Sequence, residues 1–341
     1  MHKKRILILI IAIVISMVLS NNLFADQDSV RDKQKSQKES GARTKATSGS
    51  VKDKMSYNVY IGASEGYDNN VYLDSSRKGD MFDQAMADIV FRYRLNSKLD
   101  IKARYDFTSI TYHRFTKLTM LDNEVAASFE YYPWKNVKVE AGYNGEFVNY
   151  PNNKDGDFST NGPFGGIRYY LNPKTYIGAW YHYHFYNYND RKVRGPADNK
   201  LEQTREDHRN SIVGEIATFI GKLFVKIKNT YYFNESNDQF LDYYDYDSEK
   251  IMGYFTYPVT DKLSLQANGG YQYKNFKSRV ITTSNSEKEK DNLMILGGGA
   301  YYEIFSNFYI NASYTYQQNY SNDPIQDYSG SVGTVGINYL F

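Results

Sequence analysis

The chain has 341 residues, with 41 lysines and arginines against 39 acidic residues, and a formal net charge of +2 at pH 7. This balance excludes the strongly basic surface of a typical nucleic-acid-binding protein. The absence of cysteine excludes disulfides, Cys-based zinc sites and a lipid anchor on an N-terminal cysteine. We therefore predict no nucleic-acid partner, no metal site and no cofactor.

The first 25 residues have the pattern of a signal peptide. Lys3, Lys4 and Arg5 precede an apolar run over residues 6–19, and Ala25 stands just before the first acidic residue. A run of about 14 residues is shorter than the roughly 20 that a spanning helix needs, which disfavours an uncleaved membrane anchor. We predict cleavage after Ala25, which removes three cations and no acid and leaves a formal charge of −1.

Residues 26–54 differ in composition from residues 55–341. They carry eight basic and five acidic residues, no aromatic residue, and only Val30 and Val51 as large apolar side chains. A segment with so little apolar surface does not fold alone. We predict a disordered periplasmic leader, with a plug inserted into a lumen as the alternative.

Residues 55–341 are rich in tyrosine, which occurs 35 times in the chain, with 19 phenylalanines and only seven prolines. Membrane barrels use such residues in belts at both interfaces. No stretch after the first 25 residues is long and apolar enough to be a spanning helix. A closed sheet is the other structure that satisfies all backbone groups in lipid. We therefore predict a transmembrane β-barrel over residues 55–341.

The expected strands alternate apolar and polar residues over long stretches. From residue 263 the odd positions are Leu, Leu, Ala, Gly, Tyr and Tyr, and the even positions are Ser, Gln, Asn, Gly, Gln and Lys. Similar patterns begin at residues 101, 137 and 308. A soluble β-sandwich also alternates, but its strands are nearer five or six residues long. The pattern indicates barrel strands with one lipid-compatible face.

The number of such segments predicts an antiparallel up-and-down barrel of about 14 strands, with 12 to 16 compatible. Short connections, such as residues 96–98 and 172–174, alternate with longer polar ones, such as 65–81, 150–160, 190–206, 234–245 and 277–291. This order places both ends of the barrel on the periplasmic side. The segments begin near residues 56, 82, 99, 120, 137, 161, 175, 207, 223, 246, 262, 291, 307 and 328.

The last residues place Val335, Ile337, Tyr339 and Phe341 on one face of a strand. This resembles the terminal strand of bacterial outer-membrane proteins. The resemblance implies an outer-membrane location, contact with outer-membrane lipid, and recognition by the barrel-assembly machinery through the strand that ends in Phe341.

Residues 65–74 contain Gly-Tyr-Asp-Asn-Asn-Val, which resembles the Gly-Tyr-Asp-x-Asn-Val segment of β-barrel porin families. The resemblance covers about ten residues and implies no particular substrate. Asp68, Asn69, Asn70 and Asp74 also contain oxygen ligands of the kind that calcium prefers, but Asn and Asp are common in turns, which is the favoured explanation.

Charged residues on the polar faces of the strands are the candidates for a pore lining. Their basic surplus predicts a water-filled pore with a weak preference for small anions. Four cations that flank one short connection are expected to form a cationic cluster at the periplasmic mouth; alternatively, they pair with Asp88, Asp100 and Asp106 and stiffen the wall. The candidates are Arg92, Arg94, Lys102, Arg104, Asp106, Lys138, Glu140, Arg168, Lys226 and Lys228, of which Arg92, Arg94, Lys102 and Arg104 form the expected cluster.

Enzymatic motifs are not found. No histidine stands in the His-x-Ser arrangement of outer-membrane phospholipases, and there is no Gly-rich phosphate loop. His182 and His184 share one face of a strand, and packing inside the lumen beside Trp180 and Tyr186 is favoured over metal binding. We predict that the protein is not an enzyme.

The sequence favours a porin-like channel for passive diffusion of small hydrophilic solutes. A dedicated channel for carbohydrate or exopolysaccharide is the second hypothesis, because tyrosines such as Tyr170, Tyr186, Tyr254 and Tyr309 offer stacking faces to sugars. A non-conducting surface or adhesion barrel is the third. The transported solute and the oligomeric state are left open by the sequence.

Overall fold

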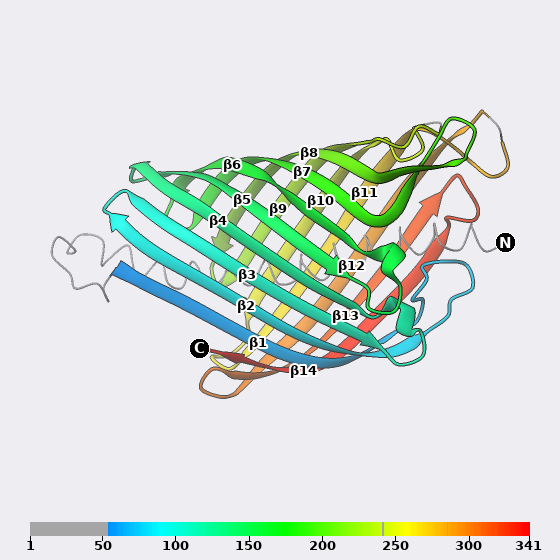
Figure 1. Cartoon of the computed structure of the whole chain (residues 1–341). Helices are drawn as coiled ribbons and strands as arrows, with labels where there is room; N and C mark the ends of the chain where they lie inside the picture. The colour runs from blue at the N-terminus through cyan, green and yellow to red at the C-terminus, as the bar shows by residue number, and fades with distance from the viewer. Residues whose placement is uncertain (1–53, 241, 285) are drawn as a thin grey trace.

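The computed structural model describes residues 54–240, 242–284 and 286–341, which form one closed β-barrel. Every strand pairs antiparallel with its neighbours in sequence, and β1 closes the ring against β14 (Figure 1). The predicted signal peptide and nearly all of the predicted leader lie outside the described residues. The strands are β1 Met55–Asp68, β2 Asp80–Asn96, β3 Leu99–Tyr112, β4 Met120–Trp134, β5 Val137–Asn149, β6 Phe158–Asn172, β7 Thr175–Arg194, β8 Lys200–Ile220, β9 Leu223–Ser236, β10 Tyr246–Pro258, β11 Leu263–Val280, β12 Lys288–Phe305, β13 Phe308–Ser321 and β14 Tyr328–Leu340, and the short 3-10 helices are η1 Thr116–Leu118 and η2 Lys154–Gly156.

The predicted alternation sets the two faces of the barrel. In β11, Leu265 and Tyr271 are exposed, whereas Asn268 and Gln272 are buried. Large apolar side chains are exposed in the same phase on the other strands, so the convex outer surface is apolar and the concave inner surface is polar. The prediction of a 14-stranded up-and-down barrel is confirmed.

Short turns and long loops occupy opposite ends of the barrel (Figure 1). The turn between β8 and β9 uses Gly221 with φ +61°, and the turn between β12 and β13 uses Asn307 with φ +67°. Both residue types tolerate the left-handed conformation that such tight turns require. The predicted order of short and long connections is confirmed.

In the described part of the chain, no helix is both long enough and apolar enough to cross a membrane.

The hairpin of β7 and β8 is longer than the sequence analysis predicted. The predicted link over residues 190–206 is shorter in the structure, because β7 continues to Arg194 and β8 begins at Lys200. The extension pairs Lys192 with Thr204 and Arg194 with Lys200 after shifts in register. Its residues are mainly polar and show no apolar face, so the period-two pattern gave no signal for strands that project beyond the apolar belt.

The sheet closes through side chains as well as through backbone pairs. β1 and β14 pair from Tyr60 opposite Leu340 to Asp68 opposite Val332. The buried Tyr60 hydroxyl donates to Asn338 Oδ1 at 2.6 Å, and the Asn338 amide donates to Asn311 on β13 at 2.8 Å. These bonds join the first strand to the last two.

β6 approaches β7 unusually closely at Gly162. A Cβ atom at Gly162 would lie 1.8 Å from the backbone oxygen of Tyr183. The next residue, Pro163, has no amide hydrogen to donate, and neither residue is in the β6–β7 ladder, which resumes at Phe164. Pro163 therefore lies within β6 at a position where the ladder to β7 is interrupted.

Candidate pore lining

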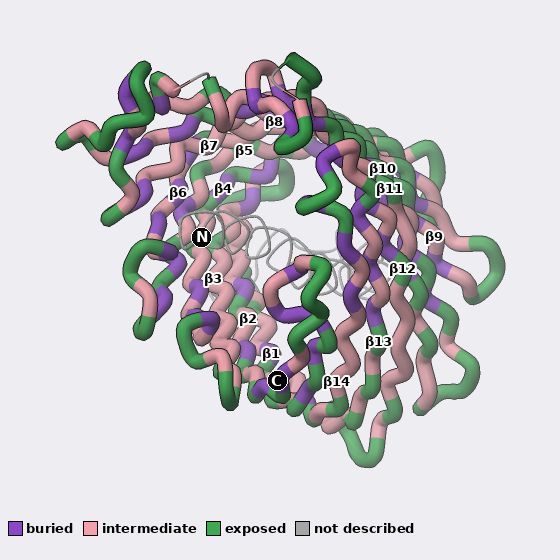
Figure 2. Tube along the Cα trace, turned by 90° about the vertical axis from the view of Figure 1, so that its right-hand side faces the viewer, coloured by how far each residue is buried: buried purple, intermediate pink, exposed green. Residues whose placement is uncertain are grey.

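All ten candidate pore-lining residues lie on the inner face of the barrel, opposite the exposed apolar face. Each is buried or half-buried. Figure 2 shows the ring of strands from one end, with β3 and β4 across the barrel from β10 and β11. The ten residues are Arg92 and Arg94 on β2, Lys102, Arg104 and Asp106 on β3, Lys138 and Glu140 on β5, Arg168 on β6, and Lys226 and Lys228 on β9.

An ion-pair network centred on Glu130 connects β2, β4 and β5. Glu130 Oε2 lies 3.2 Å from Arg92 Nε, and its Oε1 accepts a hydrogen bond from Lys138 Nζ at 2.8 Å. Lys138 Nζ also donates to Glu140 Oε2 at 3.0 Å. The Glu130 side chain is 1% exposed, so each cation compensates the cost of burying this carboxylate.

Three of the four cations of the expected periplasmic cluster, Arg92, Arg94 and Arg104, contact carboxylates. Arg94 Nε is 3.4 Å from Asp100 Oδ1, and Arg104 contacts both Asp88 at 2.9 Å and Asp106 at 2.6 Å. Lys102 is directly opposite Arg92 in the β2–β3 register. The contacts of Arg94 and Arg104 are those of the alternative hypothesis, in which ion pairs stiffen the wall.

Carboxylates occupy directly paired inner positions on four consecutive strands. Asp88 on β2 faces Asp106 on β3, Asp106 faces Glu124 on β4, and Glu124 faces Glu146 on β5. Like charges directly opposite each other destabilise a sheet, and Arg104 compensates part of this repulsion through its contacts with Asp88 and Asp106. We call these four residues the acidic row.

Cations dominate the inner face on the opposite side. Arg209 on β8, Lys226 and Lys228 on β9, Lys250 on β10 and Lys274 on β11 all point inward. In a ring of 14 strands, β3 and β4 lie seven strands away from β10 and β11, so the acidic row faces this group of cations across the barrel. The wall of the acidic row also contains cations, since Lys102 and Arg104 are on β3 and Lys138 is on β5.

Part of this basic wall is combined with tyrosines. The Arg209 guanidinium donates hydrogen bonds to Tyr186 Oη and Tyr246 Oη, both at 2.8 Å. Lys274 Nζ lies 4.6 Å from the centre of the Tyr246 ring, and the rings of Tyr232 and Tyr246 are 6.1 Å apart in an edge-to-face arrangement. We call this group the basic–aromatic patch, which consists of Tyr186, Arg209, Tyr232, Tyr246, Lys250 and Lys274.

A row of rings runs along the inner face of β7 and ends at this patch. His182 stacks on His184 with ring centres 5.9 Å apart, His184 lies 6.3 Å from Tyr186, and Tyr186 stacks on Tyr188 at 6.5 Å. Trp180 occupies the preceding inner position, 5.3 Å from the Arg168 guanidinium. The row results from the period of two, which turns alternate side chains to the same face.

The histidine pair packs inside the barrel, as the sequence analysis favoured, since His182 also stacks on Phe164 at 5.6 Å. His184 Nε2 lies 3.3 Å from Asn144 Nδ2. The described residues contain no group of three or more His, Cys, Asp or Glu side chains arranged to hold a metal ion.

The turn that follows β1 uses its Asn and Asp side chains for local hydrogen bonds. Asp68 Oδ1 accepts from the Asn70 amide at 2.8 Å, and Asn70 Nδ2 donates to the Asp74 carbonyl at 2.8 Å. These bonds are those of the turn interpretation for this segment.

The tyrosines considered for sugar stacking all belong to the inner phase of their strands. Tyr170 lies 5.9 Å from Tyr176, and Tyr254 is 4% exposed and 5.3 Å from Lys226 Nζ. Tyr186 belongs to the basic–aromatic patch, whereas Tyr309 is on β13, away from it.

Sequence reasoning missed several charged residues of the inner face. The carboxylates of Asp122, Asp207, Glu289 and Asp291 are buried there and add negative charge, which the buried cations Arg205 and Arg279 partly offset. Arg205, which was assigned to a loop, is buried on β8 and donates to Asp207 Oδ1 at 2.8 Å. Continuing the alternation of β8 toward its N-terminal end would have placed Arg205 and Asp207 in phase with Arg209.

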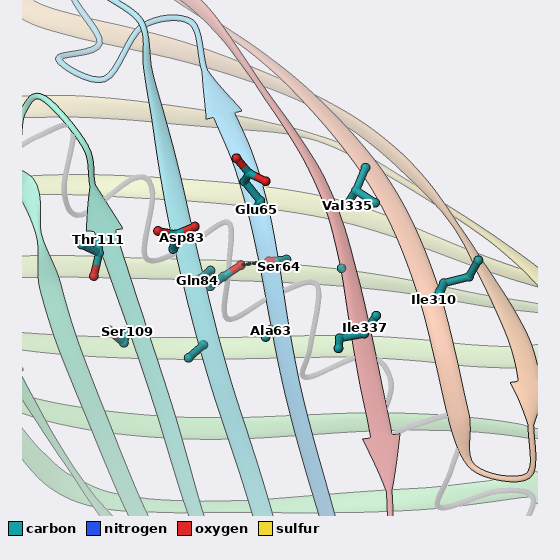
Figure 3. Close-up of a pocket in the computed structure, with 12 residues that line it drawn as sticks. Ala63, Ser64, Glu65, Asp83, Gln84, Ser109, Thr111, Ile310, Val335 and Ile337 are labelled. Atoms are coloured by element: carbon teal, nitrogen blue, oxygen red, sulfur yellow. Dashed lines mark hydrogen bonds between the residues drawn. The ribbon is translucent and has the colours of Figure 1, made fainter.

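A shallow groove of about 650 Å³ lies on the outer side of β14, β1, β2 and β3 (Figure 3). Small residues such as Ala63 and Ser109 form part of its lining, with Glu65 and Asp83 at paired positions. Asp83 Oδ2 lies 3.1 Å from His113 Nε2. Ser109 is four residues from His113 on an extended chain, roughly 13 Å at the usual rise, which is too far for a serine–histidine hydrogen bond.

Among solved structures, outer-membrane proteins have similar folds. One is OmpT of Vibrio cholerae, with 13% identity over 86% of this chain and 99% of that chain and a TM-score of 0.49. Another is a Pseudomonas aeruginosa FadL homologue, with 10% identity over 84% of this chain and 90% of that chain and a TM-score of 0.48. No protein-family model and no curated protein sequence matches the chain.

Proposed function

We propose that the protein is an outer-membrane channel through which small hydrophilic solutes diffuse passively. The observation that carries this proposal is the two-faced barrel, with apolar side chains outside and mainly polar and charged side chains on the inner face. Barrels of eight strands are filled by their side chains, whereas barrels of 16 leave an aqueous channel. A ring of 14 strands is closer in size to the barrels that leave an aqueous channel.

The outer surface supports a membrane location. Exposed residues such as Ile216, Ile251 and Leu296 provide an apolar belt, and tyrosines border it with their hydroxyls satisfied by neighbouring strands. These hydroxyls donate to asparagines across strand pairs that long loops connect, as in Tyr105–Asn123 at 2.8 Å, Tyr143–Asn161 at 2.6 Å and Tyr181–Asn210 at 2.5 Å.

The predicted segments at the two ends of the chain complete the proposal. The signal peptide of residues 1–25 would direct export, and residues 26–54 would remain as a periplasmic leader. The final strand that ends in Phe341 would be read by the barrel-assembly machinery. Deleting Phe341 tests the last point, because it should lower the amount of barrel in the outer membrane while export to the periplasm continues.

The weak anion preference is part of the proposal and rests on the basic wall of β8 to β11. Anions would pass along Lys226, Lys228 and Lys250, while the acidic row attracts cations to the opposite wall. Because the acidic row faces these cations, the net preference is expected to be small.

Planar-bilayer recording of the refolded chain from residue 26 onward tests both the channel function and the weak anion preference. We expect steady conductance and, in a salt gradient, a reversal potential on the anion side. Lys226→Gln with Lys228→Gln should move this potential toward cations, whereas Asp106→Asn with Glu124→Gln should move it toward anions. Silence from correctly inserted protein would overturn the channel and favour a non-conducting surface barrel.

A further inference from the structure

The basic–aromatic patch contains cations that make no direct ion pair among the described residues, although Asp291 is directly opposite Lys274 in the β11–β12 register. The three hydrogen-bond partners of Arg209 in this region are Tyr186, Tyr246 and the Asn234 Oδ1 atom at 3.3 Å, all of them neutral. Lys274 contacts aromatic rings, at 4.6 Å from Tyr246 and 5.3 Å from Phe276. These contacts hold the two cations in place through neutral groups.

Lys250 is a further buried cation of the patch, and it indicates independently that an anion would be stabilised there. Its side chain is on the same wall, the residue is 7% exposed, and its Nζ atom has no hydrogen-bond partner within the described part of the chain. A buried ammonium group without an anion is costly. By contrast, Lys138 at a similar exposure on the opposite wall contacts both Glu130 and Glu140. Among the described residues, the cations of the patch thus lack the direct carboxylate contacts that balance Lys138.

The neutral groups of the patch indicate what kind of anion fits. Gln272 Nε2 donates to Tyr232 Oη at 2.7 Å and to Ser248 Oγ at 3.0 Å, so hydroxyl and amide groups border the cations. Lys250 is directly opposite Gln272 in the β10–β11 register, and Ser248 is opposite Lys274. Aromatic faces, hydroxyl partners and cations without a direct ion pair together match a pyranose ring that carries a carboxylate. The ring has apolar C–H faces for stacking, hydroxyls for hydrogen bonding, and one negative charge.

We propose that the basic–aromatic patch is a binding site for acidic saccharides, which enter along the ring row of β7 and place their carboxylate between Arg209 and Lys274. The proposal rests on the channel function and names its substrate class. Tyr186 belongs to both the ring row and the patch, so a saccharide stacked along His184 and Tyr186 would bring its carboxylate to Arg209.

Block of single-channel current by sodium glucuronate tests the site. Glucose has a similar ring without the charge, acetate has the charge without the ring, and benzoate combines an aromatic ring with the charge. We expect half-block by glucuronate at a concentration at least tenfold lower than for any of the three. Block by benzoate or acetate as strong as that by glucuronate would overturn the saccharide assignment.

Substitutions in the basic–aromatic patch test whether glucuronate blocks the current by binding there. Lys274→Gln removes a cation that packs on the rings of Tyr246 and Phe276, so folding should be retained, and it should weaken glucuronate block at least fivefold. Arg209→Gln should weaken it further, whereas Arg209→Lys, which keeps the charge, should retain more of it. Tyr246→Leu should weaken block more than Tyr246→Phe, which keeps the ring. The matched control is Lys262→Gln with Lys290→Gln, which removes charge from exposed positions and should leave block unchanged.

These experiments distinguish failure of the saccharide site from failure of the channel function. Steady conductance without selective glucuronate block, or block that Lys274→Gln and Arg209→Gln leave unchanged, would overturn the binding site and keep the channel. If the refolded barrel does not conduct, calorimetric titration of glucuronate into the detergent-solubilised protein still decides the site. Saturable heat that Lys274→Gln reduces would support it, and the absence of heat would overturn it.

Discussion

Lys138 Nζ lies 2.8 Å from Glu130 Oε1, while Arg92 approaches the other oxygen of the same carboxylate at 3.2 Å. Replacing Glu130 with glutamine would leave two cations of the inner wall facing a neutral amide. Removing one member of a buried ion pair costs about 3–5 kcal/mol. We expect Glu130→Gln to lower the free energy of unfolding by about 3 kcal/mol, measured by urea titration of the refolded barrel in detergent.

The exposed Glu202 provides the control for this substitution. Glu202→Gln makes the same chemical change on the projecting part of β8 and should leave the unfolding midpoint within experimental error. Equal midpoints for the two variants would show that the Glu130 network contributes no net stability.

The seam between the first and last strands depends on the hydrogen bond from Tyr60 to Asn338. Tyr60→Phe keeps the ring and leaves the buried amide oxygen with one partner fewer, at a cost of about 1 kcal/mol. Tyr57→Phe is the control, because Tyr57 is 67% exposed on the outer face. Urea unfolding should separate the two variants, and a midpoint for Tyr60→Phe equal to that of Tyr57→Phe would mean that this bond does not stabilise closure.

The sequence predicts the faces of individual strands better than it predicts the site. In β11, the period of two is enough to turn Leu265 outward and Gln272 inward, because side-chain direction in a strand is a local property. The hydrogen bond between Arg209 and Tyr246, by contrast, joins residues that are far apart in the sequence. These residues lie on β8 and β10, and their contact depends on how far each strand is staggered against the next as the sheet closes. No pattern within either strand encodes that stagger.

The same reasoning explains why Arg205 and Asp207 were not among the predicted charges of the inner face. Asp207 follows Arg205 on a polar extension of β8, where no apolar residues mark the alternation. A strand that continues beyond the apolar belt keeps its backbone pairing but loses the signal by which sequence analysis finds it. Likewise, the acidic row is seen to face the cations of β8 to β11 only when the order of 14 strands is closed into a ring.

The two tryptophans of the chain report on opposite faces of the barrel. Trp134 is 68% exposed on β4, and Trp180 is on the inner face of β7. In lipid vesicles, brominated acyl chains quench only fluorophores that they reach. We expect strong quenching in Trp180→Phe, which retains Trp134, and little quenching in Trp134→Phe, which retains Trp180. Vesicles without bromine provide the baseline. Comparable quenching of the two variants would contradict the assignment of the faces.

Gly162 is the position where we expect a single methyl group to disturb the barrel most. A Cβ atom there would be 1.8 Å from the Tyr183 carbonyl oxygen, which belongs to the backbone of β7 and cannot rotate away. Separation of the two strands would weaken the ladder beside His184 and the ring row. Overpacking of this kind typically costs about 1–3 kcal/mol, so Gly162→Ala should unfold at a clearly lower urea concentration.

Gly214 on β8 is the matched position for this test. A Cβ atom at Gly214 has no atom within 4 Å, so Gly214→Ala adds the same methyl group without a clash. Alanine also restricts the unfolded chain more than glycine does, which should make Gly214→Ala neutral or slightly stabilising by about 0.4–1 kcal/mol. The two variants therefore change stability in different directions. If Gly162→Ala is as stable as Gly214→Ala, β6 and β7 do not approach as closely in the folded protein, and the ring row of β7 has more freedom than these contacts imply.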